Sequence, residues 1–147
     1  MAITQAMATS FKVEILTAYH NFGTTATRAT TAADTFKIAL YTSSATLSAS
    51  TTAYSATNEV SGTGYTAGGN TLTISQVPTS TSTTAWLDFA DTTWTTATIT
   101  ANGALIYNST TGAAVAVLDF GNDKTASSNF TITFPTADYT SAIIRFS

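Results

Sequence analysis

Residues 86–120, WLDFADTTWTTATITANGALIYNSTTGAAVAVLDF, decide the fold class of this chain. The stretch holds both tryptophans, and bulky side chains alternate in it with small or polar ones. Successive strand residues point to opposite faces of a sheet, so Trp86 and Asp88 are expected on one face and Leu87 and Phe89 on the other. Further aromatic and β-branched residues continue the alternation. The stretch therefore predicts four strands in quick succession, arranged as an antiparallel meander.

Polar segments predict where these strands turn. Asn102-Gly103 is a two-residue turn signal between β-rich runs, and it predicts a tight hairpin. Residues 108–112 (NSTTG) predict a polar turn before the last strand of the stretch. Two segments outside the stretch, 79–84 (TSTSTT) and 121–129 (GNDKTASSN), are predicted to be a turn and a loop.

Shorter apolar alternations flank the central stretch. Residues 36–41 (FKIALY) predict the first strand, with Phe36, Ile38 and Leu40 inward and Lys37 and Tyr41 outward. Further strands are predicted at 72–74, closed by Pro78, at 130–134, stopped by Pro135, and at 144–146.

The longest irregular stretch is residues 42–69. Its Gly62-Thr63-Gly64 and Gly68-Gly69 pairs are expected to serve turns, because no GK[ST] follows and the spacing is not that of a phosphate-binding loop. A loop of this length is usually functional or takes part in assembly.

A helical pattern opens the chain. Apolar side chains recur every fourth residue at Ile3, Met7, Phe11, Ile15 and Tyr19. Thr9 and Ser10 weaken the pattern, so the helix is expected to begin only near them, and Gly23 is a plausible stop. We expect the apolar stripe to cover the chain's own core, and the alternative is a helix that docks on a neighbouring subunit.

A chain of 147 residues forms one domain by size. Within residues 1–147 we assign a helical segment to 1–23, a low-complexity linker to 24–35 and a β domain to 36–147. The predicted fold is all-β: an antiparallel β-sandwich or jelly-roll-like domain of about eight short strands with one N-terminal α-helix.

Charge is scarce in this sequence. Charged residues make up 9% of the chain, against roughly 25% in a typical soluble domain. Only 5 Lys and Arg are present, and Thr, Ser and Ala fill the polar positions. Soluble proteins usually guard their strand edges with charge, especially Lys, so neutral edges have little to repel another β surface. We therefore expect a protein that works in an assembly, the alternative being a Thr-rich sandwich that is soluble alone.

Composition also excludes several partners. The net charge of −3 and the absence of a Lys/Arg run argue against nucleic acid. No apolar run approaches the roughly 20 residues that cross a bilayer, so no membrane partner is expected. The first residues lack the pattern of a signal peptide. Cysteine is absent, which excludes disulfides and thiolate metal sites.

No constellation of catalytic residues is visible. Asp88, Asp91, Asp119 and Asp123 could pair as glycosidase carboxylates or bind Ca²⁺, but turn aspartates commonly serve local hydrogen bonds. His20 is the only histidine, and we expect it on the surface or at a helix cap, because one His without Cys cannot build the common zinc sites. We predict a non-enzyme with no catalytic, cofactor-binding or metal site, and leave calcium at the four aspartates open.

Four blocks of the sequence resemble a group of small tailed-bacteriophage virion proteins. They are FKIALYTSSATL (36–47), TNEVSGTGYTAGG (57–69), WTTATITANGALIYN (94–108) and AVAVLDFGNDKTASSNFTITFP (114–135). The resemblance covers most of the chain and implies a β-rich structural protein, most like head decoration or cement proteins. Such proteins bind the outer face of the major capsid protein shell and often self-associate. No catalytic residue is implied.

The resemblance implies a non-enzymatic decoration protein on the outer surface of the phage head. Its partners would be the major capsid protein and further copies of itself, as a dimer or trimer, and its role would be to stabilise the head. The 42–69 loop, the N-terminal segment and neutral strand edges are the expected contacts. The alternative is a tail, neck or fibre module that binds a host glycan through exposed aromatic rings. The candidate rings are Tyr54, Tyr65, Trp86 and Trp94, although burial in a core or an interface is the commoner fate of such rings.

Overall fold

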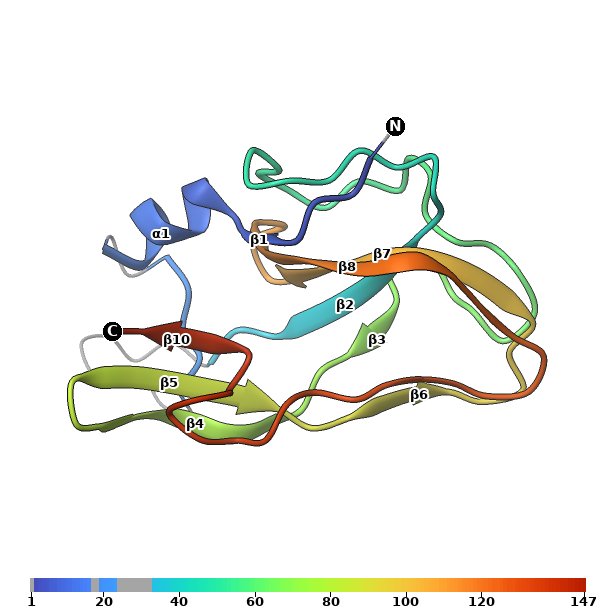
Figure 1. The fold of residues 1–147 in the computed structure, drawn as a ribbon. Coiled ribbons are helices and arrows are strands. Elements are labelled where there is room, and N and C mark those ends of the chain that lie inside the picture. The colour runs from blue at the N-terminus through green and yellow to red at the C-terminus, as the bar shows by residue number, and fades with distance from the viewer. Residues whose placement is uncertain (1, 17–18, 24–32) are drawn as a thin grey trace.

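The largest sheet has the strand order β1-β8-β7-β2-β3, and every neighbouring pair in it is antiparallel. The structure is a computed structural model, and it describes residues 2–16, 19–23 and 33–147. The sheet crosses the middle of the molecule in Figure 1. Its strands are β1 (Ala6–Met7), β2 (Phe36–Tyr41), β3 (Asn70–Thr71), β7 (Ile99–Asn108) and β8 (Ala114–Ala126).

Two smaller antiparallel sheets lie below it in Figure 1. One has the order β10-β5-β4 and the other pairs β6 with β9. Their strands are β4 (Ile74–Thr81), β5 (Thr84–Phe89), β6 (Thr92–Trp94), β9 (Phe130–Ile132) and β10 (Ile144–Phe146). The predicted all-β, sandwich-like class is confirmed. The expected simple meander is wrong, because β5 and β6 each pair with strands distant in the sequence.

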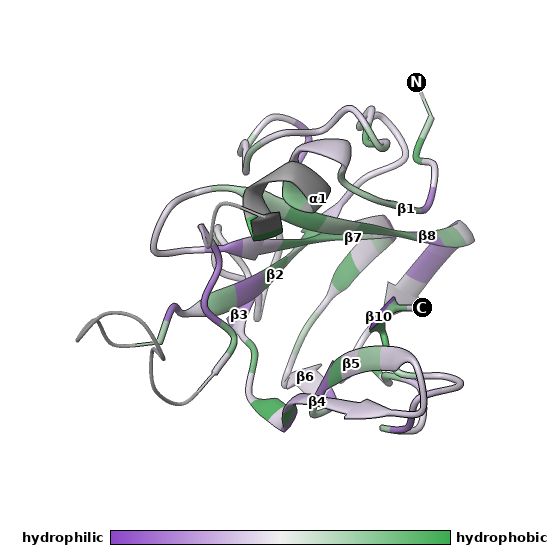
Figure 2. Cartoon of the chain, turned by 90° about the vertical axis from the view of Figure 1, so that its left-hand side faces the viewer, coloured by the Kyte–Doolittle hydropathy of each residue, from purple (hydrophilic) through white to green (hydrophobic). Residues whose placement is uncertain are grey.

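The hydrophobic core fills the space between these layers. Phe36 and Ile38 of β2 are buried and face the smaller sheets, as predicted, and the rings of Phe36 and Phe89 lie 6.2 Å apart. Burying one such side chain stabilises the fold by about 1.5–3 kcal/mol. Figure 2 shows the hydrophobic colour gathered on β7 and β8, while much of the loop backbone is pale, the colour of residues with intermediate hydropathy.

The second face of β2 is buried as well. Tyr41, expected outward, is only 1% exposed. The loop at 42–69 lies over this face of the sheet, above it in Figure 1. The Tyr41 hydroxyl donates to the backbone oxygen of Ser55 in that loop at 2.6 Å. The loop is therefore a third layer. The sequence pattern of β2 could not reveal it, because the alternation was interpreted as a strand with one face exposed to solvent.

The hairpin predicted at Asn102-Gly103 is absent, and both residues lie inside β7. Gly103 pairs with Tyr41 on one side and Asp119 on the other. A Cβ at Gly103 would stand 2.6 Å from the Leu118 carbonyl oxygen, so the glycine serves close strand packing. The chain turns instead before β7, where Thr96 has a φ of 54°.

β8 continues through most of the segment that was predicted to be a loop at 121–129. Asp119 pairs with Gly103 and Lys124 with Ala101, so residues 120–123 oppose Asn102 alone. These extra residues form a large β-bulge, after which β8 pairs with β7 again at Lys124.

Pro78 lies within β4 and does not close a strand before it. A proline is tolerated there because β4 is an edge strand and its register with β5 shifts around that position. β4 also absorbs part of the turn predicted at 79–84, and the chain reverses near Ser82, whose φ is 55°.

Only part of the predicted N-terminal helix is helical. Helix α1 (Thr9–Leu16) begins at Thr9, as the sequence indicated. Ile3 instead forms a parallel bridge with Leu47, and Met7 lies in β1, paired with Ala116. Buried Phe11 carries the helix onto the chain's own core. Residues 24–32 of the predicted linker lie outside the described residues.

Candidate assembly surfaces

His20 is a core residue, contrary to its expected surface or capping position. Its ring is buried, and the centroid of Phe11 lies 4.9 Å away in an edge-to-face arrangement. The ring atom Nδ1 lies 3.2 Å from the side-chain nitrogen of Asn108. Packing and a hydrogen-bonded neighbour in the core account for this histidine.

The four candidate aspartates do not form one site. Asp91 accepts the Phe134 amide at 2.8 Å, and Asp119 accepts the Gly121 amide at 2.8 Å. Asp123 accepts the side-chain amide of Asn102 at 2.9 Å, and Asp88 is buried on β5. Among the described residues, no three His, Cys, Asp or Glu side chains gather to hold a metal ion. The aspartates mainly satisfy nearby backbone and side-chain donors.

Most of the rings proposed as sugar platforms are packed against other rings. Trp94 is buried, and Tyr65 stacks on it with centroids 5.9 Å apart. Tyr54 stacks on Tyr107 at 4.6 Å. Trp86 is half-buried. The larger exposed apolar residues are elsewhere: Tyr19, Val77, Tyr139 and Phe146.

Glu59 anchors the loop at 42–69. Its carboxylate accepts hydrogen bonds from the hydroxyls of Tyr54 and Tyr65, each at 2.6 Å, and from the Gly68 amide at 2.7 Å. The Tyr107 hydroxyl, from β7, donates to the Gly68 oxygen at 2.8 Å. Hydrogen bonds to a charged acceptor are the stronger kind. Local composition predicted an irregular loop but could not predict this shared acceptor.

Two of these tyrosines hold their protons tightly. Burial, the hydrogen bond to Glu59 and its negative charge raise the pKa of Tyr54 to about 12. Burial first, and then the hydrogen bond to Glu59, also raise the pKa of Tyr65. Neutral tyrosines therefore donate to an acceptor that ties distant parts of the loop together. The loop is held to the sheet by other contacts, such as the Leu40 amide, which donates to the Tyr65 hydroxyl at 2.9 Å.

The loop also extends the backbone of the sheet. Glu59 bridges to Tyr41, and the Val60 amide donates to the Leu40 oxygen at 2.9 Å. At the other end of the sheet, the Tyr54 amide donates to the Gly112 oxygen at 2.9 Å. Residues 38–58 contain no charged side chain, so the outer layer presents hydroxyl and methyl groups to its surroundings.

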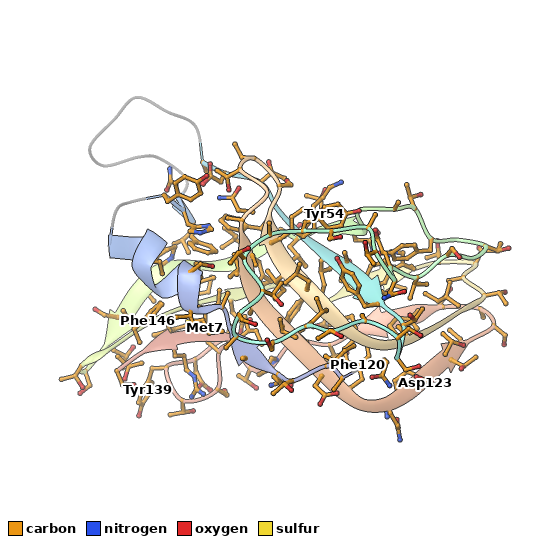
Figure 3. The ribbon with its side chains drawn as sticks, turned by 90° about the horizontal axis from the view of Figure 1, so that it is seen from above. Met7, Tyr54, Phe120, Asp123, Tyr139 and Phe146 are labelled. Atoms are coloured by element: carbon orange, nitrogen blue, oxygen red, sulfur yellow. The ribbon has the colours of Figure 1, made fainter. Side chains whose placement is uncertain are left out.

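A groove runs beside the outer edge of β8. β1 pairs with that edge only at Ala116 and Val117, so no strand of the described residues covers it from Leu118 onward. The groove holds about 570 Å³, and its walls include the apolar side chains of Leu118, Phe120, Phe130, Ile132, Phe134 and Ile143. Figure 3 shows Phe120 and Asp123 at the end of β8 away from the helix. A free strand edge beside an apolar groove is suited to contact with another protein.

The edge of β4 is protected by other means. It carries no charged residue, but Pro78 removes an N–H donor, and two register shifts with β5 distort the strand. Proline and bulges are both known guards of sheet edges. The two edges therefore differ, because β4 is uncharged and blunted by its backbone, while β8 stays open and carries Asp119, Asp123 and Lys124 beyond Val117.

No protein-family model, curated protein or solved structure matches this chain. Within the described ranges, no helix combines the length and the apolar character needed to span a membrane.

Proposed function

We propose that this chain is a non-enzymatic decoration protein of a bacteriophage head. It binds the outer face of the major capsid protein lattice, associates with itself as a dimer or trimer, and stabilises the particle. The sequence blocks that resemble small virion proteins motivate the class. The observation that carries the proposal is the open edge of β8 beside its largely apolar groove.

The β8 edge offers two kinds of contact. Backbone groups beyond Val117 can pair with an added strand once it displaces the Gln5 side chain, whose oxygen accepts the Asp119 amide at 3.3 Å. Each backbone hydrogen bond contributes about 0.5–1.5 kcal/mol net. Side chains entering the groove gain about 25 cal/mol for each Å² of apolar surface they bury. Individually weak contacts of this kind become strong when many copies bind one lattice.

The loop at 42–69 supplies the second proposed contact. Its backbone is held by Glu59, so little conformational entropy remains to be lost on binding. Its lack of charge between residues 38 and 58 means that neighbouring copies do not repel each other through this layer. Binding through it is therefore expected to depend little on salt.

The test is co-sedimentation with expanded capsids, with a charge placed in the groove. Phe120→Asp puts a carboxylate among the apolar walls, and Val77→Asp puts the same charge on the blunted β4 edge, where Val77 is 41% exposed. The wild type and Val77→Asp are expected to sediment with capsids and to raise their melting temperature, and Phe120→Asp is expected to do neither. Equal binding of all three proteins, or a cryo-EM map without this chain on the head exterior, would refute the proposal.

A glycan-binding tail, neck or fibre module is the second candidate. The observation that favours it is a polar hollow of about 470 Å³, lined by hydroxyl side chains of the loop and by Tyr54. Rings beside hydroxyl groups suit neutral sugars. Binding on a glycan array that Tyr54→Ala abolishes and Val77→Asp preserves would support this function.

A further inference from the structure

A carboxyl group is buried on the outer face of β5. Asp88 is 0% exposed, and its Oδ1 atom accepts the Phe89 amide at 2.8 Å. Its second oxygen, Oδ2, is buried without a hydrogen-bond partner. An ionised carboxylate in such a place is unfavourable, because the lost hydration is not replaced.

The segment beside this carboxyl is the C-terminal strap, residues 136–143, since Asp138 and the Ile143 backbone both act on the Asp88 carboxyl. It runs below β5 in Figure 1 and then rises into β10. β10 pairs with β5, Ile144 opposite Leu87 and Arg145 opposite Trp86. Trp86 and Asp88 share the outer face because they are two residues apart on one strand, and the indole nitrogen of Trp86 is also buried without a partner.

The strap has its own internal structure. Asp138 accepts the backbone amides of Thr140 and Ser141 at 2.7 and 2.8 Å, and it accepts both of their hydroxyls. These hydrogen bonds, the side-chain ones first, lower the pKa of Asp138 to about 2. The turn therefore stays formed over most of the acid range, so the strap can move as a preformed unit.

The charges around Asp88 also oppose its ionisation. On β4 its cross-strand partner is the uncharged Gln76. Asp91, after β5, and Asp138, in the strap, both carry like charge. Arg145 of β10 directs its guanidinium to the Thr140 carbonyl. Burial first, and these two carboxylates last, raise the pKa of Asp88, while backbone groups of Phe89 and Ile143 oppose the rise.

We propose that Asp88 is a proton-controlled latch for the C-terminal strap: the strap closes over the neutral carboxyl and opens when the carboxyl ionises. The pKa of Asp88 in the closed state lies above the ordinary value of 3.8. The closed state is therefore fully favoured below that value, and it loses stability as the pH rises through the raised pKa.

Opening of the strap would change the groove. Ile143, the last residue of the strap, lines the groove beside β8. A strap that lifts away takes this wall with it and bares the edge of β5 that β10 covers. The latch rests on the burial of Asp88 and on the strap beside it, and it holds whether or not the groove binds a capsid.

Amide hydrogen exchange across about pH 4 to 8 tests the latch, with each rate corrected for its intrinsic pH dependence. In the wild type, the opening equilibrium reported by the β10 amides, Ile144 to Phe146, should increase by up to about tenfold per pH unit until the raised pKa is passed. Asp88→Asn should abolish this dependence. Asp123→Asn, the same change at an exposed site in the β8 bulge, should preserve it.

The β7 amides of Leu105 and Ile106 report on the core. They exchange through global unfolding, which also exposes Asp88 and therefore carries the same pH dependence. The latch requires that the β10 amides exchange through a separate opening of lower free energy than the β7 amides. Equal opening free energies for β10 and β7 would mean that Asp88 controls only global unfolding, and the latch would be refuted. A flat wild-type profile, or an unchanged slope in Asp88→Asn, also refutes it. Should Asp88→Asn fail to fold, Asp88→Ser, smaller and equally uncharged, must show the same loss of slope.

Discussion

Two segments without regular structure cover this fold, and a carboxyl group is central to each. The loop at 42–69 covers the large sheet and contains Glu59, whose carboxylate accepts three hydrogen bonds from residues of the same loop. The strap at 136–143 covers β5 above Asp88, which has one oxygen without a partner. The same chemical group thus fastens one cover and weakens the other. The difference lies in the donors near each carboxyl group, because a satisfied carboxylate stabilises the loop that contains it and an unsatisfied one resists burial.

The largest expected effect comes from removing the satisfied carboxylate. Glu59→Ala leaves the hydroxyls of Tyr54 and Tyr65 and one backbone amide without their acceptor, so the free energy of unfolding should fall by about 2–4 kcal/mol. Glu59→Gln retains an acceptor oxygen and should lose about half as much. Urea denaturation measures both. Equal stability of Glu59→Ala and wild type would show that the carboxylate does not fasten the loop.

Alkaline pH should loosen the same cover. The pKa of Tyr54 is raised from 10.0 to about 12, so its contribution to stability is complete below pH 10 and is lost as the pH rises towards 12. Tyr54→Phe, which removes one hydrogen bond, should cost about 1 kcal/mol near neutral pH and reduce the slope above pH 10. Thermal unfolding at several alkaline pH values checks this. If Tyr54→Phe leaves the loss of stability above pH 10 unchanged, that loss comes from other tyrosines.

Asp88→Asn should change the free energy of unfolding in the opposite direction to Glu59→Ala. Near neutral pH the substitution removes an ionisable group from a site that disfavours charge, so the free energy of unfolding should stay the same or rise by up to about 1 kcal/mol. The same urea experiment gives the value beside that of Glu59→Gln. A loss as large as that of Glu59→Ala would remove the contrast between the two covers.

The smallest effect is expected at the turn within the strap. Asp138→Ala removes the acceptor for the amides of Thr140 and Ser141 and should speed exchange of the β10 amides a few-fold. Exchange of the Val60 amide, which belongs to the other cover, should not change. A response at Val60 would mean that the two covers are coupled.

Much of the fold could be predicted from local pattern. Alternation located β2 and the strands of the central stretch because one face of each carries bulky apolar groups. Asn102-Gly103 misled because glycine has two uses: it permits a turn, and it also permits the close approach of Leu118 that β7 requires. Pro78 misled because an edge strand tolerates proline.

The candidate surfaces were less predictable, because each depends on contacts between distant segments. The sequence indicated neutral strand edges, which is right for β4 and wrong for β8, whose open part carries Asp119, Asp123 and Lys124. It correctly singled out the loop at 42–69 as a long irregular segment. It could not show that β8 is open and β4 is blunted, since strand order decides which edges are free. Nor could it show the burial of Asp88, whose cover comes from the strap far along the chain. The capsid partner stays a prediction.

The pairing of β1 with β8 has a consequence for folding during translation. Ala6 is synthesised long before its partner Val117, because strands β2 to β7 lie between them in the sequence. The large sheet therefore cannot be completed until β8 has left the ribosome, and β1 stays without its partner until then. Contacts between such distant residues slow folding. The pairing of β1 is therefore expected to be a late step in the assembly of the large sheet.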